Sequence, residues 1–239
     1  TSNWLAVFSF SMQIYYDFAG YSLCAVGAAM ALGFKLPDNF NAPYAASGFS
    51  DFWHRWHISL SQWMRDYLYF PLGGNRHGLI NGLRNLIIVM FLGGLWHGAS
   101  WNFVIWGMFH GMLLVLEHLL KEWKQMRVPP ILSVFTTFTL VTLIWIPFRS
   151  TDLSESIYSF SQLFNHDLMY FKELTIQQIV ALAVLFLTLA YQYWRREKYL
   201  ADLLQKVPYT IQATLLSMAM LTIALTSTGD SHAFIYFQF

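Results

Sequence analysis

One histidine stands in a segment whose neighbours suit it to chemistry. His97 lies in Gly93-Gly94-Leu95-Trp96-His97-Gly98-Ala99-Ser100-Trp101-Asn102, between long stretches without charged side chains. A histidine at membrane depth beside three glycines needs partners for two ring nitrogens, because the neutral imidazole both donates and accepts a hydrogen bond. His97 is therefore the strongest candidate for chemistry. A core histidine satisfied by a backbone carbonyl explains the pattern equally well.

A second histidine lies in a segment rich in tryptophan, residues 50–67. Its apolar positions recur at helical spacing and its other positions are polar, which predicts an amphipathic helix capped by Ser50 or Asp51. One interpretation is an interfacial helix with its arginines at the lipid headgroups. The other is a site in which His57 and Ser61, four residues apart, share a face with His54 and hold a hydroxyl or a ligand. We predict no metal site, because no acidic or cysteine ligand stands nearby.

Three further patterns carry weaker signals. The turn Tyr69–Gly78 predicts either an anion cradle formed by backbone N–H groups and Arg76 or a plain glycine turn, and it lacks the phosphate-loop signature. His110, between two glycines, indicates close helix packing in which the imidazole bridges two helices. The end of the chain, residues 234–239, predicts an interfacial aromatic belt or a tail that returns the Tyr236 hydroxyl to a cavity.

The composition indicates which elements position these residues. The chain has 239 residues, of which 56% are hydrophobic and 11% charged. Soluble domains are charged at roughly a quarter of their positions, so a polytopic membrane protein is predicted. The net charge of +1 gives no general attraction to nucleic acid, and the single cysteine, Cys24, forms no internal disulfide.

Stretches without charged residues predict the membrane spans. Residues 128–148, 174–194 and 207–229 are uncharged for 21, 21 and 23 positions, and about 20 apolar residues cross a bilayer. The opening stretch 1–34 is also apolar but carries Asp17 at its middle. An acidic residue at that depth is expected to face the interior of a helical bundle.

The stretch 85–119 is too long for one simple span, and glycines interrupt it. If it enters and returns to the same side, 12 of the 14 Lys and Arg residues lie on one face, and only Arg149 and Lys172 lie on the other. That asymmetry is typical of cytoplasmic against external loops. We therefore predict a broken, hairpin-like element whose turn, near residues 96–99, lies within the membrane. Irregular backbone at that depth must line a cavity.

Three sequence blocks, taken in this order, resemble a known family. Asp51–Ser61, Tyr67–Arg76 and Gly93–Trp101 are similar to motifs of the membrane-bound O-acyltransferase family, in the branch that includes the membrane subunit of bacterial alginate O-acetylation. The resemblance implies an all-α polytopic bundle with a broken or re-entrant helix and an amphipathic interfacial helix. It implies that residues 1–239 form a single membrane-embedded domain, the C-terminal half of a family member, whose N-terminal helices are missing.

The resemblance also implies roles for single residues. The active-site histidine of the family falls on His97 and its second motif histidine on His57. Tyr236 matches the central tyrosine of an aromatic C-terminal motif and is expected to act as an acyl carrier. The positions that we predict to bind substrate are Arg55, Arg76, Ser61, Trp96 and Asn102.

The expected activity is O-acetylation of an extracytoplasmic polysaccharide such as alginate, with acetyl-CoA as the cytoplasmic donor and no tightly bound cofactor. A multi-pass protein of the bacterial inner membrane is expected, with an extracytoplasmic acetyltransferase as its partner protein and no nucleic acid. D-alanyl transfer to teichoic acid, a proton-coupled transporter and a non-catalytic assembly subunit are the alternatives.

Overall fold

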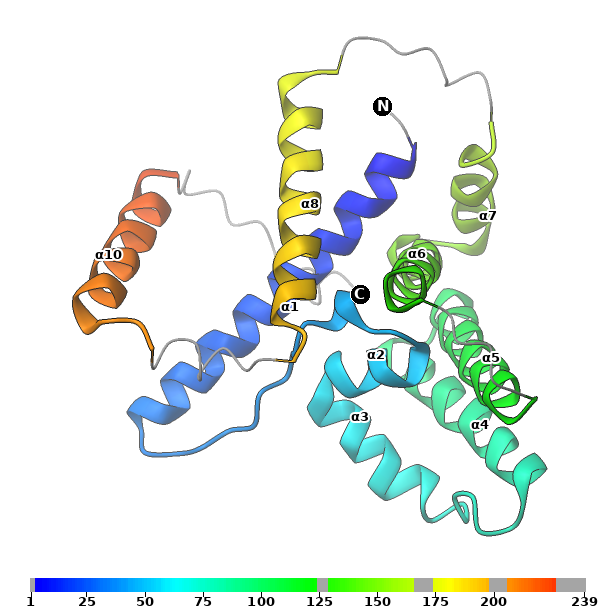
Figure 1. Ribbon diagram of the computed structural model, residues 1–239. Helices are drawn as coiled ribbons and strands as arrows, with labels where there is room; N and C mark the ends of the chain where they lie inside the picture. Colours follow the sequence, from blue (N-terminus) through cyan, green and yellow to red (C-terminus); the bar gives the residue numbers. More distant parts are fainter. Residues whose placement is uncertain (1–2, 124–128, 166–173, 198–205, 227–239) are drawn as a thin grey trace.

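The structure, a computed structural model, describes residues 3–123, 129–165, 174–197 and 206–226, and every regular element within these ranges is helical (Figure 1). Helices α4, α5, α6 and α8 are long and apolar enough to cross a membrane. The predicted all-α fold class is confirmed. In chain order the elements are α1 (Asn3–Ala31), η1 (Pro43–Ala45), α2 (Phe49–Arg55), α3 (Ile58–Met64), the π-helical η2 (Arg65–Tyr69), α4 (Leu79–His97), α5 (Trp101–Trp123), α6 (Pro130–Arg149), α7 (Leu153–Gln162), α8 (Ile176–Arg195) and α10 (Tyr209–Thr226).

The predicted spans correspond to helices. Residues 128–148 and 174–194 become α6 and α8, and both meet the length and hydropathy of a membrane span. The stretches 1–34 and 207–229 become α1 and α10, which are helical but are not among the four spans found in the described part of the chain. In Figure 1, α10 stands apart from the group formed by α4, α5 and α6.

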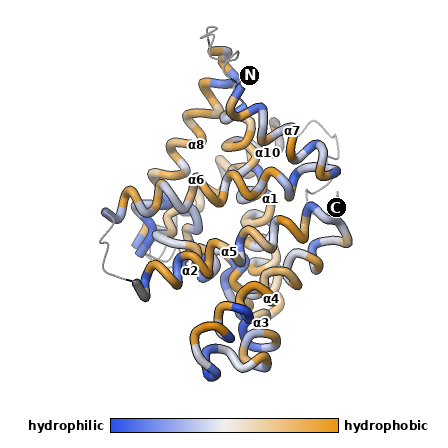
Figure 2. Tube along the Cα trace, turned by 90° about the vertical axis from the view of Figure 1, so that its right-hand side faces the viewer, coloured by the Kyte–Doolittle hydropathy of each residue, from blue (hydrophilic) through white to orange (hydrophobic). Residues whose placement is uncertain are grey.

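Helix α8 buries polar side chains and exposes apolar ones, the reverse of a helix in a soluble protein. Its buried residues are the polar Thr188, Gln192 and Arg195, whereas Phe186 and Leu187 are 72% and 64% exposed. A large exposed apolar face marks a membrane or protein contact. The apolar colouring that runs along α8 in Figure 2 thus fits a helix with lipid on its outer side.

The core is largely aromatic and is centred on α6. Val141, Trp145 and Phe148 of this helix are at most 1% exposed. Trp145 contacts Trp56, the residue after α2, and Trp106 of α5, with ring centroids 5.1 and 5.9 Å apart. Helix α6 therefore ties the chain's N-terminal part to the α4–α5 pair.

Local sequence sets several helix ends. The Thr175 side chain accepts a hydrogen bond from the backbone N–H of Gln178, and the Gln178 side chain accepts one in return, so α8 begins with a capping box. Asp152 caps α7 by accepting the backbone N–H of Glu155 at 2.8 Å. Pro130 occupies the first turn of α6, where its missing N–H costs no hydrogen bond.

Helices α4 and α5 form the predicted broken element, with residues 98–100 as the connection. They cross at glycines: a Cβ at Gly94 would lie 2.2 Å from the carbonyl oxygen of Phe103, and one at Gly107 would lie 2.2 Å from that of Met90. Only glycine permits this backbone approach. Each helix is long enough to span a membrane by itself, and the depth of the turn stays a prediction.

The expectation of one helix over residues 50–67 is wrong. The segment divides into α2, α3 and η2, and the chain breaks at Trp56–His57, where His57 adopts a left-handed conformation with φ of 43°. Trp53 and Trp56 are buried at 6% and 2% exposure. They belong to the core, so the interfacial interpretation fails for this part of the segment.

Candidate active site

The conformation of His57 is imposed by a neighbouring loop. Left-handed backbone is uncommon outside glycine and costs of order 1–3 kcal/mol. Asn39 supports it, because its carbonyl accepts the N–H of Ile58 at 3.0 Å and its side-chain Oδ1 accepts the N–H and hydroxyl of Ser59 at 3.2 and 3.0 Å. Its Nδ2 donates to Ser22 of α1 at 3.2 Å. Asn39 thus fixes the start of α3 relative to α1.

The same asparagine determines the tautomer of His57. Oδ1 of Asn39 lies 3.2 Å from Nδ1 of His57, and this atom must be the oxygen because it already accepts the Ser59 N–H. Burial lowers the pKa of His57 from 6.5 to about 4, so the ring is neutral at neutral pH. Nδ1 therefore carries the proton and donates it to Asn39. Nε2 keeps a lone pair and can only accept a hydrogen bond.

His97 is the last residue of α4 and faces α5 and α6. It lies one turn beyond Gly94 and so extends from the glycine crossing on the same face of the helix. Its ring meets those of Trp106 and Phe148 edge to face, with centroids 5.0 and 5.1 Å apart. The next residue is Gly98, and a side chain has little room there, because an added Cβ would lie 2.6 Å from the Phe103 ring.

The structure brings His57, Trp96 and His97 together. The Trp96 ring is 6.2 Å from that of His57 and 5.0 Å from that of His97. Trp96 itself is 61% exposed. Two histidines 40 positions apart in the sequence therefore form one site, which the sequence predicted residue by residue but not as a pair in contact with Trp96.

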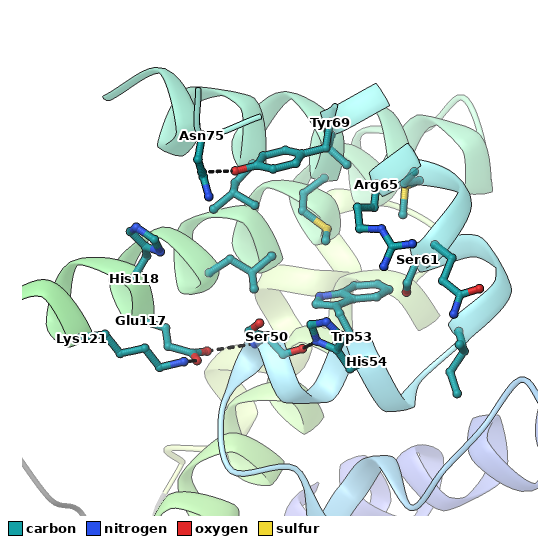
Figure 3. A pocket seen from close by; sticks show the side chains of 17 residues that line it. Ser50, Trp53, His54, Ser61, Arg65, Tyr69, Asn75, Glu117, His118 and Lys121 are labelled. Carbon is teal, nitrogen blue, oxygen red and sulfur yellow. Dashed lines mark hydrogen bonds and ion pairs between the residues drawn. The ribbon is translucent and has the colours of Figure 1, made fainter. Parts of the chain in front are cut away.

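A cavity of about 430 Å³ lies among α2, α3, η2, α4 and α5 (Figure 3). Ser61 lines it, as do the basic side chains of His54, Arg65, His118 and Lys121; neither His57 nor His97 does. We expected His54 and His57 to share a helix face, but they do not, because α2 ends and α3 begins between them. The carbonyl of Ser50 holds Nδ1 of His54 at 2.6 Å.

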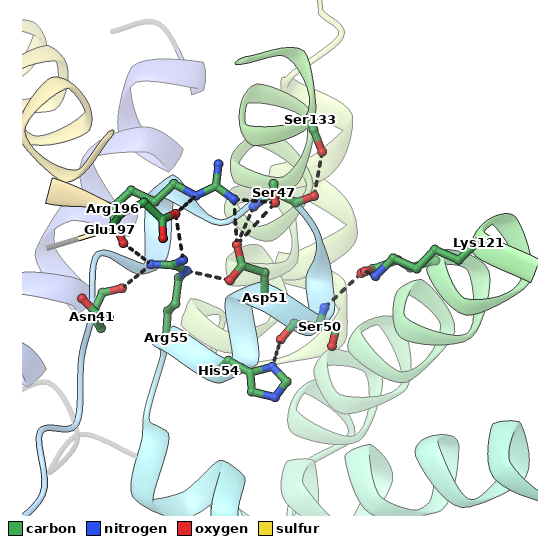
Figure 4. Close-up of polar contacts among 11 residues, drawn as sticks. Asn41, Ser47, Ser50, Asp51, His54, Arg55, Lys121, Ser133, Arg196 and Glu197 are labelled. Atoms are coloured by element: carbon green, nitrogen blue, oxygen red, sulfur yellow. Dashed lines mark hydrogen bonds and ion pairs between the residues drawn. The ribbon is translucent and has the colours of Figure 1, made fainter. Parts of the chain in front are cut away.

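Arg55 lies in an ionic network away from the cavity (Figure 4). Its side chain is 12% exposed, its Nε contacts Asp51 at 2.7 Å and an Nη donates to the carbonyl of Arg196 at 2.8 Å. Burial alone raises the pKa of Asp51, but the Ser47 N–H and the Arg55 and Arg196 charges outweigh it and lower the pKa. These contacts give Arg55 a structural role, joining α2 to the end of α8, and none of them supports phosphate binding.

The glycine turn after η2 does not form an anion cradle. The N–H groups of Gly73, Gly74 and Arg76 already donate to carbonyls of the same turn. The buried Asn85 donates to the carbonyls of Leu72 and Gly74 at 3.1 and 3.0 Å. The backbone part of that prediction is therefore wrong. The Arg76 side chain is exposed, and its role stays a prediction.

Asn102 has structural partners. It is 2% exposed, donates from Nδ2 to the carbonyl of Ser150 at 2.8 Å and accepts from the Ser156 hydroxyl at 3.4 Å. It thereby fixes the start of α5 against the α6–α7 connection, and these contacts do not support substrate binding. Tyr236 lies outside the described residues, so its role as an acyl carrier stays a prediction. Within the described ranges, no group of three His, Cys, Asp or Glu side chains is placed to hold a metal ion.

Sequence reasoning missed Asn39 and the cavity side chain Lys121. Asn39 stands in a stretch rich in Pro and Asn that predicts only a loop. Its proximity to His57 depends on a contact across 18 positions, for which the sequence holds no signal. Lys121 stood out only as a basic residue of the more basic face, whereas Arg65 is among the arginines expected to be available for the phosphates of the donor.

Comparison with known proteins extends these observations. The family model of the membrane-bound O-acyltransferase family matches residues 2–146. The chain is 42% identical over 189 residues to a probable alginate O-acetylase AlgI of Pseudomonas putida, covering 79% of this chain and 39% of that protein. It is 43% identical over 158 residues to a peptidoglycan O-acetyltransferase of Helicobacter pylori, covering 64% and 30%. It is 33% identical over 155 residues to a teichoic acid D-alanyltransferase of Bacillus subtilis, covering 58% and 39%. The chain thus spans about two fifths of the length of the AlgI relatives.

Proposed function

Because this chain belongs to the membrane-bound O-acyltransferase family, we propose that it contributes the reacting histidines of an enzyme that O-acetylates an extracytoplasmic polysaccharide such as alginate. The observation that carries the proposal is the meeting of His57 and His97 at Trp96, from two separate helical elements. Both histidines stand in segments that the family model covers.

In the proposed reaction His97 is the general base. It accepts the proton of an attacking hydroxyl while the hydroxyl oxygen bonds to the carbonyl carbon of a thioester; the C–S bond then breaks and the thiol leaves with a proton. A positioned base contributes typically 10²–10⁴-fold, about 3–5 kcal/mol of the barrier. A tyrosine or sugar hydroxyl needs this help because its own pKa is about 10 or higher.

The tautomer of His57 suggests a different role from polarising the thioester carbonyl. That role requires a donor, and the Nδ1 proton of His57 is directed at Asn39. Nε2 accepts, so His57 is suited to orient a hydroxyl or N–H group of the reacting partners. We therefore assign His57 to orientation and His97 to proton transfer.

We propose that the donor is acetyl-CoA and that it enters through the 430 Å³ cavity. Ligand cavities commonly measure about 300–1,000 Å³. Arg65 engages Asp66 through two of its nitrogens, at 2.8 and 3.2 Å, and an arginine carries five N–H donors. Donors are therefore left at the rim for phosphate oxygens. Trp53 closes the inner wall next to the aromatic core.

The acceptor side of the proposal follows the relatives. We propose a location in the bacterial inner membrane and an extracytoplasmic acetyltransferase as the partner protein that receives the acetyl group, with Tyr236 as the carrier. The four spanning helices and the family support a multi-pass membrane protein. D-alanyl transfer from a carrier protein is the second candidate, favoured by the 33% identity to a teichoic acid D-alanyltransferase.

The test uses the whole protein in membrane vesicles supplied with labelled acetyl-CoA. We compare the wild type with His97→Ala, Tyr236→Phe and, as a matched control, His77→Ala, whose exposed side chain lies outside the site. We expect label to be transferred by the wild type and the control, and to fall by at least about 100-fold in His97→Ala.

The outcomes separate the candidates. Loss in His97→Ala but not in Tyr236→Phe removes the tyrosine from the mechanism and leaves the base in place. Transfer that survives His97→Ala, or a wild type that takes no label, refutes the acetyl-transfer proposal. Vesicles that accept D-alanine from a charged carrier protein instead would establish the second candidate, and a pH gradient dissipated without either donor would indicate a transporter.

A further inference from the structure

His110 is a buried histidine that the proposed reaction does not use. It lies in α5, is 0% exposed and stacks on Phe52 of α2 with ring centroids 6.0 Å apart. Neither of its ring nitrogens has a hydrogen-bond partner among the described residues. Buried polar side chains are nearly always hydrogen-bonded, and leaving one unsatisfied costs about 1–3 kcal/mol.

Three tryptophans that also lack hydrogen-bond partners lie around His110. The rings of Trp106, Trp53 and Trp145 lie 4.8, 5.0 and 6.4 Å from the imidazole. The indole nitrogen of each is buried and has no partner within the described part of the chain. We refer to these four side chains as the His110 cluster. Packing alone explains one such atom, but it does not explain five atoms in one place.

The cluster cannot satisfy itself. An indole is a donor only, and a neutral imidazole offers one donor and one acceptor. The four side chains thus bring four N–H donors and one acceptor nitrogen. They need oxygen acceptors from outside the set. Two water molecules supply four acceptor lone pairs and can donate to the remaining imidazole nitrogen, which matches the deficit.

The position of the cluster gives it consequences. Trp53 also lines the 430 Å³ cavity, and Trp145 lines a second cavity of about 240 Å³ among α1, α6 and α7, with Arg149 and Glu155 at its walls. Trp106 lines neither cavity and contacts His97 at 5.0 Å between centroids. The His110 cluster therefore contributes to the walls of both cavities and adjoins the candidate base.

We infer that the His110 cluster binds ordered water and forms a buried hydration site that links the two cavities beside His97. The bound water satisfies the indole and imidazole groups and holds Trp106 against the His97 ring. His110 is thus a positioning residue of the site rather than a helix-packing residue only. The hydration site stands independently of the proposed function, whereas its effect on acyl transfer rests on that function.

X-ray hydroxyl-radical footprinting of the whole protein in lipid nanodiscs tests the hydration site without any substrate. Radicals form where water is, so a buried side chain is oxidised only if water adjoins it. The probe is Trp106, and the matched reference is Trp56, which is equally 2% exposed but whose indole nitrogen is not among the buried unpartnered atoms. We expect Trp106 to be oxidised several-fold faster than Trp56. Equal rates at both residues refute the hydration site.

Two variants of similar size separate hydration from packing. His110→Gln keeps a donor and an acceptor, whereas His110→Met keeps neither. We expect oxidation of Trp106 to persist in His110→Gln and to fall to the rate of Trp56 in His110→Met. A variant that does not fold is recognised by its elution profile, and the wild-type comparison decides in that case.

Acyl transfer provides the second readout. We expect kcat to fall about tenfold in His110→Met, with KM for the donor unchanged and partial recovery in His110→Gln, because a displaced Trp106 misplaces the base without touching the donor. Equal kcat in all three proteins refutes the positioning role. Fast oxidation of Trp106 in a protein without acetyl transfer would uphold the hydration site and reject the proposed function instead.

Discussion

The glycine crossing of α4 and α5 makes a quantitative prediction for Gly94→Ala. The added Cβ would lie 2.2 Å from the Phe103 carbonyl oxygen, whereas ordinary contacts begin at 3.4 Å. Helix α5 must therefore move by about 1.2 Å, and the obstacle is backbone that cannot rotate away. Overpacking of this kind costs about 1–3 kcal/mol. Alanine gains up to about 1 kcal/mol of helix propensity over glycine, which leaves a net loss of up to about 2 kcal/mol.

The effect on the site exceeds the effect on stability. His97 lies one turn from Gly94 and contacts Trp106 of the displaced helix. A misplacement of about 1 Å lowers catalysis by about 100-fold. We expect acyl transfer in vesicles to fall by that factor, and thermal unfolding in detergent to occur at a lower temperature than in the wild type.

The matched control is Gly20→Ala, a helical glycine of α1 with nothing within 4 Å of the added Cβ. This variant gains the higher helix propensity of alanine without a steric clash, so it should be as active as the wild type and slightly more stable. The two variants should differ in stability by the overpacking cost alone, about 1–3 kcal/mol. If Gly94→Ala matches Gly20→Ala in both assays, the crossing is not as close as described and the argument fails.

Three further predictions use the same whole protein. Folding lowers the pKa of His57 from 6.5 to about 4, so the unfolded chain binds a proton at a higher pH than the folded chain, and the folded state loses about 2 kcal/mol of stability when the pH falls to 5. The decrease in unfolding temperature between pH 7 and pH 5 should be smaller in His57→Gln than in the wild type. An equal decrease would contradict the buried neutral ring. Asp51→Asn removes the carboxylate shared by Arg55 and Arg196 and should destabilise by about 2 kcal/mol, whereas Asp66→Asn, at an exposed pair, should unfold like the wild type. Asn39→Ala should lower kcat about tenfold with little change in KM, because the His57 ring loses its hydrogen-bond acceptor. The control is Asn81→Ala, which loses an exposed contact to the His77 carbonyl. An equal decrease of kcat in both variants would point to general misfolding.

The helices and the two histidines could be predicted from local sequence. Charge-free stretches gave α6 and α8 because a bilayer imposes a minimum apolar length on any span. The break between α4 and α5 was predictable because three glycines interrupt a stretch that is too long. His97 was singled out because a polar ring at this place needs an explanation.

The remaining features depend on contacts between distant segments. The helical periodicity of the sequence continues through Trp56, but the helix is interrupted there because Asn39 binds the backbone of the following residues. Arg55 was expected to meet phosphates, and it contacts the carbonyl of Arg196 across 141 positions instead. No local pattern encodes such partners, so the sequence indicated the residue types of the site but not the cavity wall or the network behind it.

The short connection between α4 and α5 has a consequence for how the site is assembled. A loop of a few residues closes at little entropic cost, so the α4–α5 hairpin forms from local contacts as one insertion unit and already contains His97, Trp106 and His110. His57 arrives separately, because its placement needs α1, Asn39 and the break before α3. The two halves of the site thus depend on contacts of different sequence range. Local contacts alone can therefore place His97, whereas the orientation of His57 depends on the packing of α1.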